Sequence, residues 1–165
     1  MAKQDAFTTD EWAQLRLAPA LVSSGIAAAD PSGIFSTIKE ASAGMQSMLA
    51  SLKSGGDLEL FAAMAADGSL PGMPDPKTLV GEGSRDEQRQ HLKKAVLERA
   101  KAAAELVASK ASPAEAAAYR NLLVEVAQKA ANASKEGGFL GIGGVRLSEN
   151  EQAFIEEIKR AVGHG

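Results

Sequence analysis

The side chains with the clearest potential chemistry are carboxylates near predicted helix ends. Calcium and magnesium bind clustered oxygen ligands, so carboxylates that meet in the fold could hold a divalent cation. The candidate ligands are Asp30, Glu136, Glu149 and Glu151. No segment has the ligand spacing of an EF-hand loop. Helix capping and exposure to solvent remain the alternative interpretation of all of these residues.

The residues and motifs that other kinds of catalytic site require are missing from the sequence. The chain contains no cysteine, which excludes disulfides, thiolate metal sites and cysteine nucleophiles. The two histidines, His91 and His164, are far apart in the sequence, so a zinc site or a Ser-His-Asp triad is hard to assemble. A Gly-x-Ser-x-Gly motif is also missing. We therefore expect neither enzyme activity nor a resident cofactor.

The most distinctive stretch is the glycine-rich segment 136–147. A predicted helix precedes it, whereas a dinucleotide-binding fingerprint needs a strand there, and the Gly-Lys-Ser/Thr of a phosphate-binding loop is missing. Its large apolar side chains also distinguish it from a polar, flexible linker. We expect a folded loop whose candidate interaction residues are Phe139, Leu140, Ile142 and Arg146.

Composition and charge narrow the class of protein. Hydrophobic residues make up 45% of the 165 residues but aromatic residues only 4%, which favours closely packed helices over a large sheet. The net charge is −3, and acidic and basic residues alternate without a clustered basic face. Binding of DNA or RNA is therefore not expected.

Membrane insertion and secretion are not expected either. The first residues contain no apolar h-region of a secretory signal. The longest weakly polar stretch, 15–29, contains Arg16 and is too short to span a bilayer. We expect a cytoplasmic protein without a transmembrane segment.

Helix starts are marked repeatedly by capping boxes. In this motif a Ser or Thr and a Glu three residues later each bind a backbone N–H group that the helix leaves unpaired. The pattern occurs at Thr8, Ser84, Ser112 and Ser148. Together with apolar residues at helical spacing, it predicts helices over 10–29, 33–53, 85–109, 113–135 and 149–162. Asp57 is expected to cap a further short helix, and Pro19 predicts a kink or two abutting helices.

These elements predict an all-α fold, a compact bundle of about six to seven helices in a single domain, 1–165. Segment 67–83, rich in proline and glycine, is expected to link helical halves at 8–66 and 84–163. Each half alone offers little apolar surface for a stable core. The halves could be related by a repeat, because Trp12-Ala-Gln-Leu and Tyr119-Arg-Asn-Leu each open an apolar helix that ends at an acidic residue and glycine.

Two resemblances follow from short motifs. Ile26-Ala-Ala-Ala-Asp, together with the Ser148-Glu-Asn-Glu helix cap, resembles the TerB-like helical domains of the tellurite-resistance type. The stretch Gly-Gly-Phe-Leu-Gly-Ile-Gly-Gly-Val-Arg from Gly137 resembles a family of uncharacterised bacterial proteins. The TerB resemblance implies a bacterial helical domain with a divalent-cation or stress-related role. The second resemblance implies no particular activity.

We expect a non-enzymatic bacterial domain that binds a partner protein or itself, in a stress-related setting. The first alternative is a TerB-like domain that binds a divalent cation through the carboxylates named above. The second is a small-molecule carrier in which the glycine-rich segment covers a pocket beneath Phe139 and Leu140.

Overall fold

A computed structural model describes residues 4–29, 48, 50, 53, 58–67, 74, 76–136 and 149–164. Every regular element among these residues is a helix, which confirms the all-α prediction. The elements are, in chain order, the short 3-10 helix η1 (Gln4–Ala6), α1 (Thr9–Ala29), α3 (Glu59–Ala66), α4 (Pro76–Val80), α5 (Arg85–Lys110), α6 (Pro113–Glu136) and α7 (Glu149–Val162).

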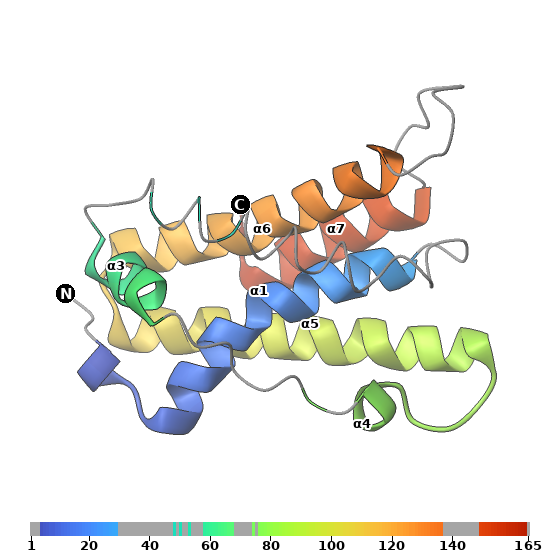
Figure 1. Cartoon of the computed structure of the whole chain (residues 1–165), viewed down its shortest axis with the longest axis horizontal. Helices are drawn as coiled ribbons and strands as arrows, with labels where there is room; N and C mark the ends of the chain where they lie inside the picture. The colour runs from blue at the N-terminus through green and yellow to red at the C-terminus, as the bar shows by residue number, and fades with distance from the viewer. Residues whose placement is uncertain are drawn as a thin grey trace.

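Four long helices form the body of the protein, and α1 lies at its centre. It contacts α5, α6 and α7, while α5 also contacts both α6 and α7 (Figure 1). The short helix α4 packs on α5, and α3 lies at the end of the bundle nearest the N-terminus (Figure 1). No helix among the described residues is long and apolar enough to cross a membrane.

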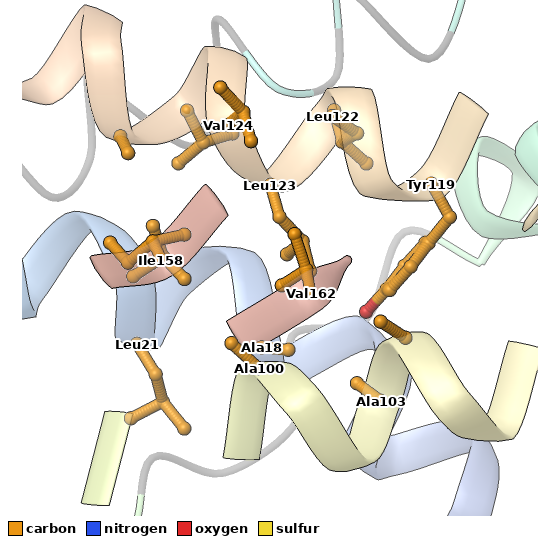
Figure 2. Close-up of a cluster of buried hydrophobic side chains, with 14 of the residues drawn as sticks. Ala18, Leu21, Ala100, Ala103, Tyr119, Leu122, Leu123, Val124, Ile158 and Val162 are labelled. Carbon is orange, nitrogen blue, oxygen red and sulfur yellow. The ribbon is translucent and has the colours of Figure 1, made fainter. Parts of the chain in front are cut away.

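The core consists of the apolar faces that the helical spacing predicts. Figure 2 shows Ala18, Leu123 and Ile158 converging from α1, α6 and α7. The helices approach most closely at Gly25 of α1. A Cβ atom there would lie 2.9 Å from Cε1 of Phe154 and 3.1 Å from both γ-carbons of Val96. Glycine therefore lets α1 contact α5 and α7 directly.

Capping boxes fix the starts of α1, α5 and α6 as predicted, whereas Ser148, the predicted cap of α7, lies outside the described residues. At α1 the backbone N–H of Thr8 donates to Glu11 Oε2 at 2.8 Å, and the backbone N–H of Glu11 donates to Thr8 Oγ1 at 3.2 Å. The same reciprocal pair joins Ser84 and Glu87 at α5. Phe7 packs on Trp12 with ring centres 5.9 Å apart, a hydrophobic staple that sets the entry into α1.

Proline 19 does not divide the first helix, since α1 is continuous from Thr9 to Ala29. Proline has no N–H, so the carbonyl of Leu15 loses its usual helical donor. The hydroxyl of Tyr119 replaces that donor and binds the Leu15 oxygen at 2.6 Å. In Figure 2 the Tyr119 hydroxyl points away from its own helix into the interior. A side chain of α6 thus completes the hydrogen bonding of α1, and burial raises the pKa of the Tyr119 phenol.

Three details differ from the sequence-based expectations or add to them. Segment 67–83 is not only a linker, because it contains α4, which is held to α5 by the hydrogen bond between His91 Nδ1 and the Val80 carbonyl at 2.9 Å. Leu58 is the N-cap residue of α3 and gives no side-chain hydrogen bond, and Asp57, which was predicted as the cap, lies outside the described residues. Most of the predicted helix 33–53 lies outside the described residues, although Met48, within it, is helical and buried.

Candidate functional site

A surface hollow among the described residues lies between α6 and α7, which run side by side (Figure 1). It has a volume of about 610 Å³. We call it the α6–α7 groove, and its lining residues are Gln128, Glu149, Gln152, Ala153, Ile155, Glu156, Lys159 and Arg160. All but Gln128 belong to α7, so α7 supplies most of the groove.

The sequence of α7 divides the helix into two faces. Phe154, Ile158 and Val162 recur at a spacing of four and are buried against the bundle. The opposite side, which we call the outer face of α7, consists of the exposed residues Glu149, Gln152, Ala153, Glu156 and Arg160. Their spacing of three, four and seven residues places them on one stripe of the helix. The strong apolar packing of the inner face therefore holds the outer face in a fixed orientation.

Charges are distributed unevenly along the outer face of α7. Glu149 is the first residue of the helix, and Lys159 and Arg160 lie in its last turn, where each charge complements the helix dipole. Between them, Lys159 Nζ donates to Glu156 Oε1 at 2.7 Å. This hydrogen bond with Lys159, aided by the positive charges of Lys159 and Arg160, lowers the pKa of Glu156. One end of the groove is therefore acidic and the other end is basic, and between them Glu156 is paired with Lys159.

The remaining lining residues suit contact with a polypeptide. Gln128 and Gln152 carry amide groups that both donate and accept hydrogen bonds, and both are exposed. Ile155 is buried and Ala153 is small, so the groove also offers apolar contact. Its lining residues in the described part of the chain include no serine, cysteine or histidine that could act as a nucleophile or imidazole base.

The predicted metal ligands are not brought into one cluster within the described part of the chain. Glu149 is exposed at the start of α7, whereas Glu151 is only 3% exposed, on the other side of the same helix. Glu136 is the last residue of α6, but the position of its side chain lies outside the description, as does Asp30 altogether. In the residues that are described, no three His, Asp or Glu side chains gather as metal ligands.

The divalent-cation hypothesis thus stays a prediction. Melting curves with millimolar calcium, magnesium or manganese against chelator test it, and an unchanged melting temperature would count against it. The candidate loop residues Phe139, Leu140, Ile142 and Arg146 lie outside the described residues, and the carrier hypothesis also remains a prediction.

Sequence reasoning recognised Glu115 only as part of a capping box, and its larger role was missed. Its side chain is 2% exposed, and its Oε2 accepts hydrogen bonds from both the backbone N–H and the hydroxyl of Ser112, each at 3.0 Å. Its Oε1 accepts from the backbone N–H of Leu60 at 3.1 Å. Leu60 lies in the first turn of α3, so one carboxylate binds the starts of both α3 and α6. Glu115 supplies the cap that Leu58 cannot give.

A second polar group, which is partly buried, was also missed. Asp67 directly follows α3, and its Oδ2 accepts from the indole N–H of Trp12 at 3.0 Å and from Arg16 Nη1 at 2.8 Å. Arg16 Nη2 also donates to the backbone carbonyl of Asp67 at 2.9 Å. A buried Trp needs an acceptor for its N–H group, so Trp12 indicated that a hydrogen-bond acceptor lies beside it. Nothing in the local pattern identified a residue so distant in the sequence.

A smaller hollow of about 320 Å³ lies between α1 and α5. Its lining residues are Gln14, Leu17, Leu21, Glu98, Arg99 and Ala102. Acidic and basic residues are adjacent at Glu98 and Arg99, rather than at opposite ends as in α7. This hollow therefore provides control positions for experiments on the α6–α7 groove.

Comparison of the chain with known protein families, with curated proteins and with solved structures gave no match.

Proposed function

We propose that this protein is a binding module that acts by holding a polypeptide in the α6–α7 groove, rather than by catalysis. The observation that carries the proposal is the outer face of α7, where acidic, amide and basic side chains surround an apolar floor. Charged and hydrogen-bonding groups around an apolar centre are the usual organisation of protein interfaces.

Three polar groups that are buried or partly buried in the described part of the chain support this choice indirectly. Glu115 and Asp67 join helices through hydrogen bonds to backbone or side-chain donors. Tyr119 donates to a backbone carbonyl of α1. These hydrogen bonds explain why Glu115 and Tyr119 are buried and why Asp67 is partly buried. The outer-face residues Glu149 and Arg160, by contrast, are exposed, and α7 would form without them because its inner face is apolar.

The character of the groove favours a polypeptide over other ligands. Small-molecule sites are enclosed and mostly apolar, whereas charged and amide side chains form most of this lining. Nucleic acids require a predominantly basic surface, and here Glu149 and Glu156 accompany Lys159 and Arg160. A polypeptide carries charges of both signs and backbone amides, so it can pair with the acidic, basic and amide side chains of the groove.

Site-specific photo-crosslinking tests the proposal. A photoreactive phenylalanine analogue replaces Gln152 in the groove, or Ala102 on α5 as the matched exposed control. We expect a discrete protein adduct from position 152 that disappears when Arg160→Glu is added and persists when Arg99→Glu is added. Mass spectrometry then identifies the adduct. Equal labelling from positions 152 and 102, or labelling indifferent to Arg160, would refute the proposed function.

A further inference from the structure

The charges on the outer face of α7 are arranged so that the helix complements a reversed copy of itself. Glu149 lies at its first position and Arg160 lies on the same stripe in its last turn, about three turns later. Both side chains are exposed. When two such helices lie antiparallel, the acidic end of each meets the basic end of the other.

On the basis of the proposed function, we propose that the polypeptide held in the α6–α7 groove is α7 of a second copy of this chain. A two-fold axis crossing the helix between Phe154 and Ile155 places Glu149 of one copy opposite Arg160 of the second copy. The symmetry forms this pair twice, once at each end of the contact. Two-fold dimers with such self-complementary surfaces are the commonest protein oligomers.

The centre of the contact fits the same register. The axis sets Ala153 opposite Glu156 of the second copy, and the methyl side chain of Ala153 lets two helices approach closely. The two Glu156 carboxylates come near the axis, where like charges would repel. Each is already paired with Lys159 of its own chain at 2.7 Å, and Arg160 adds a further positive charge beside it. The middle of the dimer is therefore close to neutral.

The groups that face this contact from the neighbouring helices do not oppose it. Gln128 of α6 is uncharged and lines the groove. Glu157, at the edge of α7, is 3.7 Å from Lys93 of α5, which partly balances its charge. The register thus brings no unbalanced charge into the centre of the contact.

The size of the contact predicts a weak, reversible dimer. A helix of 14 residues is about 21 Å long, which is short for a stable interface of the usual area. The attraction between exposed charges is also weakened by salt. We therefore expect dimer formation to increase with protein concentration and to decrease as salt is added.

Sedimentation velocity over a concentration series, at low and at high salt, tests the proposal. We expect Glu149→Arg and Arg160→Glu each to raise the dimer dissociation constant about tenfold or more. The double variant E149R/R160E restores opposite charges at both ends and should dimerise like the native chain. The matched controls are Glu98→Arg and Arg99→Glu on α5, which should leave the dimer unchanged. Circular dichroism melts verify that every variant is folded.

A chain that stays monomeric at all concentrations, or a double variant that fails to recover association, would overturn the dimer. The crosslinking experiment separates this failure from that of the proposed function. An Arg160-dependent adduct with a different protein, from a monomeric chain, would retain the groove as a binding site and exclude the second copy as its occupant.

Discussion

At the α3 end of the bundle, the buried carboxylate of Glu115 and the partly buried side chains of Asp67 and Arg16 are hydrogen-bonded within the protein, whereas along the outer face of α7 groups of the same chemistry lie in solvent. Glu115 and Asp67 bind backbone and side-chain donors from helices distant in sequence. Glu149 and Arg160 are exposed at opposite ends of one helix. The difference teaches that charge alone does not mark a functional residue in this fold. Charges that join helices belong to the structure, and those on the outer face are available for binding.

The largest expected effect tests the buried side of this comparison. Glu115→Ala removes the acceptor for the backbone N–H of Leu60 and for both donors of Ser112. Leaving buried donors unsatisfied should lower the free energy of unfolding by about 3 kcal/mol, measured by urea denaturation. Glu149→Ala, on the outer face of α7, is the control and should cost under about 1 kcal/mol. Similar losses of unfolding free energy in both variants would contradict the distinction between the buried and the exposed carboxylates.

Packing gives the next effect. Gly25→Ala places a methyl group 2.9 Å from the Phe154 ring and 3.1 Å from Val96. Overpacking should outweigh the better helix propensity of alanine and lower stability by about 2 kcal/mol. Ala153→Leu, which enlarges an exposed residue on the outer face of α7, should change stability by less than about 0.5 kcal/mol. If Gly25→Ala stabilised the protein in denaturation experiments, the close approach of α1 to α5 and α7 would be wrong.

A double-mutant cycle sharpens the account of Pro19. Tyr119→Phe removes the donor to the Leu15 carbonyl and should cost about 1 kcal/mol. In a Pro19→Ala background the new N–H can bind that carbonyl within α1, so the same change should cost clearly less. Chemical denaturation of the four proteins gives the coupling. Equal costs in both backgrounds would show that Tyr119 does not compensate for Pro19.

The smallest expected effect depends on pH. The pKa of Glu11 is lowered from 4.5 by its hydrogen bonds with Lys110 and with the backbone of Thr8, and that of Glu87 by its hydrogen bonds with Ser84. A lowered pKa in the folded state gives stability that is present above the unfolded value and is lost as the pH falls through the folded one.

The double variant E11Q/E87Q tests this, because glutamine can still complete a capping box but does not titrate. Its melting temperature should fall less than that of the native chain between about pH 5 and about pH 3. Glu156→Gln on the outer face of α7 is the comparison. It should have a smaller influence on the acid response, since it removes one carboxylate of lowered pKa and the double variant removes two. Parallel pH curves for the native chain and the double variant would contradict the expectation.

The parts of the fold that depend on neighbours in sequence could be predicted. Capping boxes at Thr8, Ser84 and Ser112 form because their two members are three residues apart, and the predicted helices 10–29 and 149–162 bury apolar residues at helical spacing, among them Leu15 and Phe154. The contact between Glu115 and Leu60 could not be predicted, because it joins residues 55 positions apart and any of several acidic residues could have served.

The groove was missed for a related physical reason. Glu149, Lys159 and Arg160 complement the helix dipole, so their positions in the sequence already have a structural explanation. Only the packing of α7 on the bundle shows that the intervening side chains Gln152 and Ala153 face outward beside α6. The sequence pattern gives the apolar face of a helix but not which neighbouring helix borders the opposite side.

The hydrogen bond between Tyr119 and Leu15 has a consequence for the order in which the chain matures during translation. Its partners are 104 residues apart, and at ribosomal rates this distance corresponds to about 5–20 s of synthesis. Throughout that interval the Leu15 carbonyl can accept hydrogen bonds only from water, because α6 has not yet been synthesised. Completion of α1 is therefore delayed until the second half of the chain has emerged.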